Sequence, residues 1–104
     1  MTNQLLTDHQ GRQIRLTEER WQHILTHPEM DGQQNRLQEV LSSPEVVIAT
    51  QKDASVHAYH RWYERTPVTQ KHAVVVVKLL ENDAFVLTAY FTSRVRKGNV
   101  IWQR

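Results

Sequence analysis

The stretch HAVVVVKLL at residues 72–80 is the feature that most restricts the fold. Successive side chains of a strand point to opposite faces of a sheet, and apolar residues here occupy both alternating sets. Such a strand is stable only where other parts of the chain cover both faces, so the pattern predicts a central position in a sheet. Lys78 is the one charge near its end, and a buried amine there needs an anionic partner.

Four further segments have strand character, because they are rich in β-branched and aromatic residues and are separated by polar turns. They cover residues 45–50, 56–63, 84–92 and 99–103. Near the N-terminus, LLTDHQGRQIRL predicts a short hairpin that turns through Asp8 to Gly11.

The region between the hairpin and the strands has helical spacing. Thr17 is suited to cap a helix that continues to about Thr26, with acids in its first turn. A second helix, capped by Asp31, is expected to end before Pro44. Strands gathered after helices predict an α+β domain. We expect two N-terminal helices packed on one face of a four- to five-stranded antiparallel sheet, with a short N-terminal hairpin.

Length and composition set the broad class of protein. The chain of 104 residues has room for one domain, residues 1–104, with a modest core. Cysteine is absent, which excludes disulfides, thiolate metal sites and a cysteine nucleophile. The longest apolar run is too short to cross a bilayer and the first residues lack an export signal, so we expect a cytoplasmic protein with no membrane contact. A net charge of +2 and a pI near 9.2 mildly favour a polyanionic partner.

The strand at 84–92 is expected to have one apolar and one hydroxyl-bearing face. The residues expected to face the helices are Phe85, Leu87, Ala89 and Phe91. The residues expected on the opposite face are Val86, Thr88, Tyr90 and Thr92. Three cations follow the strand, namely Arg94, Arg96 and Lys97. Hydroxyls and guanidinium groups both bind phosphate oxygens, so this arrangement predicts a phosphate-binding surface.

The segment HILTHPEM at residues 23–30 holds a second candidate. His23 and His27 are four positions apart, but Pro28 disfavours a helical conformation at His27 and favours an extended one. We therefore expect His27 at the end of the helix, outside its regular turns. Two interpretations stay open: a histidine that caps the last carbonyls, and a titratable group that is presented to a site.

In their order, these motifs resemble the phage-type branch of the barnase, EndoU, colicin and RelE-like nuclease superfamily. The resemblance rests on ERWQHILTHPEM, SPEVVIAT, VVVVK, LTAYFTSR and GNVIW, and it covers roughly residues 18–103. It implies N-terminal helices and an antiparallel sheet whose open face binds and cuts RNA without a metal or other cofactor. The residues to which it assigns catalysis are His27, Lys78, Thr88 and Tyr90.

These residue types suit metal-independent RNA cleavage. The reaction needs a base for the 2′-hydroxyl proton, a cation for the charge on the phosphorane and an acid for the leaving 5′-oxygen. His27 can act as base or acid, and Lys78 or Arg94 can hold the phosphate. The residues expected to contact RNA or its phosphates are Tyr59, Thr92, Arg94, Arg96 and Lys97, with Trp62 as an alternative to Tyr59 for stacking on a base.

Structural roles compete with these assignments. Lys78 could extend along the sheet into solvent, and the hydroxyl row could be a solvated sheet face. Three histidines invite a zinc site, but the spacing of His57, His60 and His72 matches no known metal pattern. We therefore expect no metal and no cofactor.

The length of the turn between the strands at 72–80 and 84–92 determines which side chains of the second strand share a face with Lys78. An even number of loop residues puts Lys78 on the face of Phe85 and Leu87, whereas an odd number puts it with Thr88 and Tyr90. The sequence leaves this choice open.

Three functions remain, in descending order. The first is a small metal-independent ribonuclease that is phage-derived or toxin-like, with an antitoxin or immunity-type protein as its partner. The second is a catalytically silent relative that binds nucleic acid. The third is a protein-interaction module whose exposed edge strands recruit a partner by strand addition. The particular RNA, the partner and the oligomeric state stay open.

Overall fold

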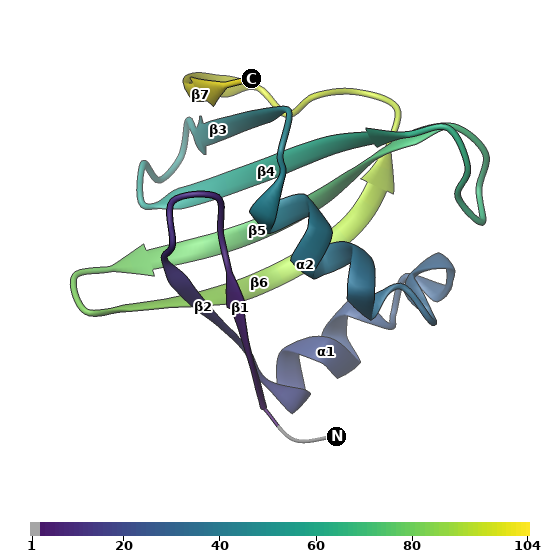
Figure 1. The fold of residues 1–104 in the computed structure, drawn as a ribbon, viewed down its shortest axis with the longest axis horizontal. Coiled ribbons are helices and arrows are strands. Elements are labelled where there is room, and N and C mark those ends of the chain that lie inside the picture. The colour runs from purple at the N-terminus through teal and green to yellow at the C-terminus, as the bar shows by residue number, and fades with distance from the viewer. Residues whose placement is uncertain (1–2) are drawn as a thin grey trace.

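A computed structural model describes residues 3–104 of the chain (Figure 1). The described elements follow in the order β1 (Gln4–Thr7), β2 (Gln13–Leu16), α1 (Glu18–Ile24), η1 (Pro28–Met30, a 3₁₀ helix), α2 (Gln34–Ser42), β3 (Val46–Thr50), β4 (Val56–Tyr63), β5 (Lys71–Leu80), β6 (Asp83–Thr92) and β7 (Gly98–Gln103).

The strands form one sheet with the order β1-β2-β6-β5-β4-β3-β7. The five strands from β6 to β7 in this order are antiparallel throughout. β5 lies between β4 and β6, and its residues 73–77 are buried, which confirms the central position predicted from its sequence. Turns too short for a crossover join β3 to β4 and β5 to β6, so these neighbours are antiparallel.

The sheet is larger than expected, because the N-terminal hairpin belongs to it. β2 pairs with β6 in parallel at Arg15 and Phe85, which gives a mixed sheet of seven strands rather than an antiparallel one of four or five. Ile14 and Leu16 of β2 are fully buried in the main core, and this burial brings the strand beside β6. Arg15 also donates two hydrogen bonds to Asp83 at the start of β6, which holds the two strands together.

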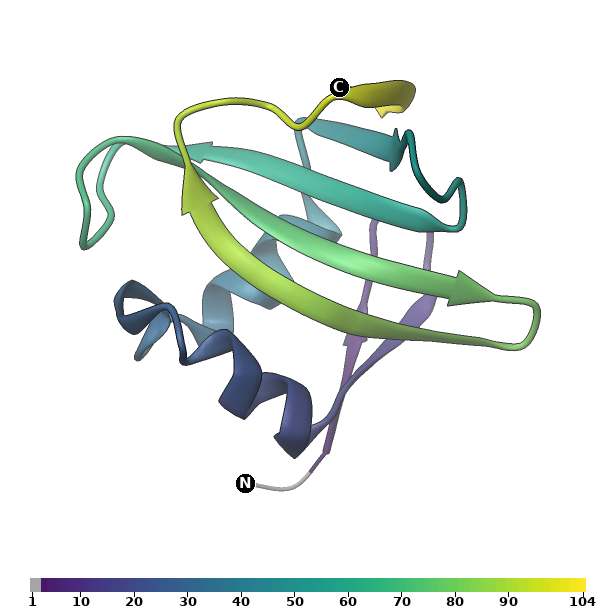
Figure 2. The ribbon, with the colours of Figure 1, turned by 180° about the vertical axis from the view of Figure 1, so that it is seen from behind.

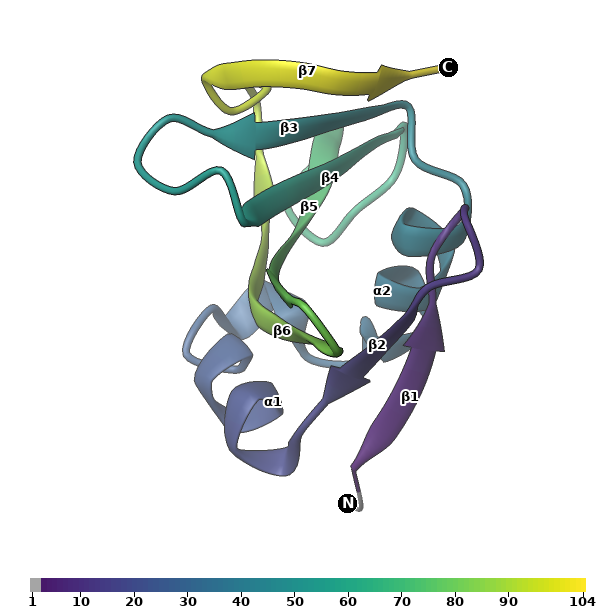
Figure 3. The same cartoon turned by 90° about the vertical axis from the view of Figure 1, so that its left-hand side faces the viewer.

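Both helices pack against one face of the sheet, as the sequence predicts. Trp21 and Ile24 of α1 join a core that also contains Leu37 and Leu41 of α2 and residues of β5. Figure 3 shows α2 between the hairpin and the remaining strands, in agreement with its contacts to β1, β4 and β5. Each fully buried aliphatic side chain contributes roughly 1.5–3 kcal/mol of transfer free energy, so this shared core fixes the helices relative to the strands.

The helix ends differ in part from the prediction. Thr17 caps α1 as predicted, and its side chain accepts a hydrogen bond from the Arg20 backbone. α2 begins at Gln34 rather than after Asp31, because Gly32 has a φ of +78° and interrupts any regular helix between them. No helix among residues 3–104 combines the length and apolar character that a membrane span requires.

A β-bulge in β6 changes the faces of its first half. Val76 lies opposite Thr88, whereas Val77 lies opposite Val86, so Leu87 is the extra residue. Val86 therefore joins the helix-side core, and Leu87 packs against the cluster on the other face. The expected alternation is wrong for residues 85–87 and correct for residues 88–92, because a bulge reverses the parity along a strand.

We call the sheet face opposite the helices the open face; its buried centre comprises Ile48, Ala58, Val74 and Val76. The β5–β6 turn has two residues, since Leu80 pairs with Asp83, and this even number puts Lys78 opposite Phe85. Because of the bulge, Thr88 and Tyr90 share this face with Lys78. Lys78 therefore shares its face with Phe85 and also with Thr88 and Tyr90, whereas each turn length considered from the sequence predicted only one of these neighbours.

Candidate functional site

His27 lies at the border of the open face. It precedes η1 with an extended backbone (φ −91°, ψ 100°), as expected for a residue before proline. Its N–H donates to the Ile24 carbonyl, and its side chain makes no hydrogen bond that caps the start of η1. The partly exposed imidazole instead lies against Tyr90, with ring centroids 6.1 Å apart and an interplanar angle of 44°. The imidazole therefore lies beside a residue of the open face.

The register of the sheet places Tyr90 within an ordered set of rows. Across β6, β5 and β4, the row of Tyr90 continues through Val74 to His60. One neighbouring row runs from Thr88 through Val76 to Ala58, and the other runs from Thr92 through His72 to Trp62. The hydroxyls predicted from the sequence and two histidines of β4 and β5 therefore share one surface.

Two polar atoms on this surface are buried without a hydrogen-bond partner among the described residues, namely Thr88 Oγ1 and His72 Nδ1. The His72 ring also contacts Trp62, with centroids 4.9 Å apart. Buried polar groups usually have partners, and an unpaired one costs about 1–3 kcal/mol. The hydroxyls, the histidines and Trp62 that share these rows make the surface around Tyr90 a candidate binding surface.

His60, at the far end of the Tyr90 row, is fully buried. Its Nε2 accepts a hydrogen bond from the Arg96 backbone at 3.0 Å, and its Nδ1 lies 3.2 Å from the Ala58 carbonyl. This arrangement requires the neutral ring with the proton on Nδ1. Burial lowers the pKa of His60 to about 4, and the charges of His72 and Arg96 act in the same direction.

The three cations after β6 lie in the connection to β7, which Figure 2 shows passing from the end of β6 to the other side of the sheet. Arg94, Arg96 and Lys97 are exposed, and none has an ion-pair partner within residues 3–104. The hydrogen bond from Arg96 to His60 ties this connection to β4. The segment therefore brings uncompensated positive charge to the edge of the open face.

Lys78 is not close to His27 in this arrangement. It is opposite Phe85 and lies four positions along β5 from Val74, the partner of Tyr90, or about 13 Å along the strand. Its Nζ binds Asp53 at 2.6 Å and Ser55 Oγ at 2.7 Å. The Lys78 contacts lower the pKa of the Asp53 carboxyl. The anionic partner expected for this amine is thus Asp53.

Tyr59 requires a correction, because it is not on the open face. It lies in the helix-side core, 1% exposed, and donates a hydrogen bond to Asp8 Oδ2. Burial and the Asp8 carboxylate raise the pKa of this phenol. It cannot stack on an RNA base. The partly exposed Trp62, with the opposite parity in β4, lies on the open face.

The three histidines considered as zinc ligands do not share one face of the sheet. His57 is opposite Val77, a helix-side residue, whereas His60 and His72 lie on the open face. Among residues 3–104, no three His, Cys, Asp or Glu side chains lie close enough together to hold a metal ion.

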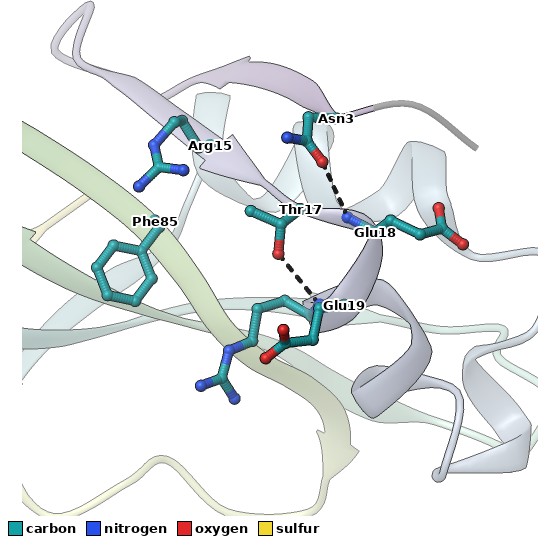
Figure 4. Close-up of a pocket in the computed structure, with 7 residues that line it drawn as sticks. Asn3, Arg15, Thr17, Glu18, Glu19 and Phe85 are labelled. Carbon is teal, nitrogen blue, oxygen red and sulfur yellow. Dashed lines mark hydrogen bonds between the residues drawn. The ribbon is translucent and has the colours of Figure 1, made fainter.

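A hollow of about 370 Å³ lies where the hairpin and the start of α1 meet β6 (Figure 4). Its lining residues are Asn3, Arg15, Thr17, Glu18, Glu19, Arg20 and Phe85. Several of these groups are already used within the fold: Asn3 accepts from the Glu18 backbone, and Arg15 binds Asp83. The mixture of two acids with two bases favours no single class of ligand.

The edges of the sheet are β1 and β7. Val100 and Ile101 of β7 are 56% and 48% exposed, which is the feature that strand addition would use. A register shift in the pairing with β3 leaves Ile101 unpaired, and such irregularities make an edge less suitable for a further strand.

From the sequence alone, His72 is considered only as a possible zinc ligand and Lys52 is not considered. His72 becomes a candidate only through its place between Trp62 and Thr92, and Lys52 only through its proximity to Arg96 and Lys97. The sequence could have indicated His72 only through its pairing with Trp62, which puts both side chains on one face. That pairing depends on the register between β4 and β5, which the sequence does not give.

No protein-family model matches this chain, and no curated protein or solved structure matches it either.

Proposed function

We propose that this protein is a small metal-independent ribonuclease that cleaves RNA phosphodiester bonds at the open face. The observation that carries the proposal is the contact between His27 and Tyr90, 6.1 Å between ring centroids, at the border of a face with hydroxyls and nearby cations. A titratable imidazole, phosphate-binding hydroxyls and positive charge are the components that the reaction needs.

In the proposed reaction, one imidazole removes the proton of a 2′-hydroxyl while that oxygen bonds to the adjacent phosphorus. The bond from phosphorus to the 5′-oxygen breaks, and a protonated group supplies a proton to the leaving oxygen. The products are a 2′,3′-cyclic phosphate and a 5′-hydroxyl. His27 is our candidate for one proton transfer. His72, which lies between Trp62 and Thr92 on the same face, is the candidate for the other.

The remaining groups are proposed to bind the RNA and to orient it for cleavage. Tyr90 and Thr88 donate hydrogen bonds to phosphate oxygens, and Thr92 and Arg94 extend this contact toward the 93–97 segment. Trp62 offers an aromatic ring on which a base can stack. Lys78 is outside this proposed site, because Asp53 and Ser55 already occupy its ammonium group.

A second candidate function is RNA binding without cleavage. The observation in its favour is the ion pair of Lys78 with Asp53, because the ammonium group expected to stabilise a phosphorane is already paired. The exposed cations after β6 would still bind the phosphates of RNA.

The test is cleavage of single-stranded RNA by the purified protein in EDTA. We expect products with 2′,3′-cyclic phosphate ends, and RNA with a 2′-deoxy substitution at the scissile position should resist cleavage. Salt-dependent binding of a broad RNA set without any cleavage would contradict the ribonuclease proposal and support the second candidate. The absence of both binding and cleavage would contradict both.

A further inference from the structure

A second hollow, of about 220 Å³, lies between the end of β3 and the 93–97 segment. Its lining residues are Thr50, Gln51, Lys52, Arg96 and Lys97. Three of these five are cations and none is an acid. Within residues 3–104, none of the three cations has an ion-pair partner. The hollow is therefore positively charged and chemically uniform, in contrast to the mixed hollow beside Phe85.

The backbone that carries two of these cations is fixed on both sides. The Arg96 N–H is bound by His60, which is itself fully buried. Gly98 pairs with Thr50 and has a φ of +153°, and a Cβ at this position would lie 2.3 Å from the Ala49 carbonyl oxygen. Only glycine permits this close approach of the segment to β3. A segment held in this way loses little conformational entropy when it binds a ligand.

The opposite wall of the hollow is also ordered. Thr50 is buried, and its hydroxyl donates to the Asp53 carbonyl at 2.8 Å, which closes the turn that carries Lys52. Asp53 is the acid nearest in sequence, and the ammonium group of Lys78 compensates its charge. This ion pair therefore keeps an uncompensated carboxylate away from the hollow.

We propose that this hollow is a phosphate-binding subsite. Its ligand is a phosphate group, either free or as part of an RNA strand, and the RNA source rests on the proposed function. Three strand spacings separate β3 from β6, or about 14 Å, so one phosphate cannot occupy both this hollow and the position beside Tyr90. In RNA the hollow would hold a different phosphate of the same strand and so contribute to its position rather than to the chemistry.

The first test uses inorganic phosphate and the wild-type protein. We expect phosphate to shift the backbone amide resonances of residues 50–52 and 96–98 in a saturable manner. The double variant Lys52→Ala/Lys97→Ala, which changes two exposed side chains, should lose this response. The matched control is Arg65→Ala/Arg104→Ala, which removes the same charge from exposed positions outside the hollow and should respond as the wild type does.

The second test uses a non-cleavable 2′-deoxy oligonucleotide and compares the same proteins. Each lost phosphate contact lowers the slope of log affinity against log salt by about 0.7 for single strands. The hollow is proposed to hold one phosphate, so we expect the hollow variant to lower this slope by about 0.7 and the control by much less. A response to inorganic phosphate without this change in slope would assign the hollow to free phosphate.

Gly98→Ala tests whether the position of the segment matters apart from its charge. If this variant is folded, it should weaken the phosphate response although every cation is retained. Should it fail to fold, His60→Phe, which removes the acceptor of the Arg96 N–H, provides the same test through the other attachment of the segment. The proposal is overturned if the Lys52 and Lys97 variant responds to phosphate and oligonucleotide as the charge-matched control does. None of these binding measurements depends on cleavage, so a failure of the ribonuclease proposal remains distinguishable.

Discussion

His27 lies beside Tyr90, and the row of paired residues that starts at Tyr90 passes through Val74 to His60, yet the surroundings of the two histidines differ in every respect that controls reactivity. His60 is fully buried, and both ring nitrogens have backbone partners. His27 is partly exposed, and its side chain contacts an aromatic ring without a capping hydrogen bond. The comparison shows that histidine content alone says little. Hydrogen-bond partners and burial separate a structural imidazole from one that can exchange protons with a substrate.

Acid should affect the buried histidine most strongly. The pKa of His60 falls from its ordinary value of 6.5 to about 4 in the folded state, so the unfolded chain binds this proton first as the pH falls. The contribution of the neutral His60 ring to the free energy of unfolding is complete above pH 6.5. It is lost between pH 6.5 and 4 and does not change further below pH 4. The total loss is about 3 kcal/mol.

Urea unfolding between pH 7 and 4 measures this loss. His60→Gln lacks the titrating group, so its free energy of unfolding should fall less over this range than that of the wild type. Other groups contribute to both proteins and cancel in the comparison. Parallel curves for the two proteins would show that His60 does not cause the acid sensitivity.

At neutral pH, substitution should separate the two histidines by their effect on folding. His60→Phe removes the acceptor for Arg96 and the partner of the Ala58 carbonyl, so we expect a loss of about 1–3 kcal/mol in the free energy of unfolding. His27→Ala should change it by no more than about 0.5 kcal/mol, as is usual for positions near the surface. Denaturant midpoints provide the measurement. A large loss for His27→Ala would indicate a structural role for this residue.

A smaller effect concerns two cations, Arg94 just after β6 and Lys78 near the end of β5. Arg94→Ala should lower the salt slope of oligonucleotide binding by about 0.7, because this exposed cation is free to contact phosphate. Lys78→Ala should leave the slope nearly unchanged, since Asp53 already pairs with Lys78. Titrations of a 2′-deoxy oligonucleotide at several salt concentrations distinguish them. An equal change for both variants would return Lys78 to the site.

Local patterns were sufficient to predict the central strand, the cap at Thr17 and the extended backbone at His27. Features that depend on distant partners were not predictable in the same way. The parallel pairing of Arg15 with Phe85 joins segments 70 residues apart, and the bulge at Leu87 follows from the fit of two strands rather than from either one. Tyr59 has an aromatic ring that could stack on a base, but its position in β4 points the ring into the helix-side core, beside Asp8.

Direct comparison of His27→Ala with His23→Ala tests the central claim. His23 is exposed in the last turn of α1, so its substitution removes an equivalent side chain four residues before His27. With both variants folded, initial rates of single-stranded RNA cleavage in EDTA should fall at least about tenfold for His27→Ala and stay near the wild-type rate for His23→Ala. Equal rates for all three proteins would contradict the assignment of His27 to proton transfer.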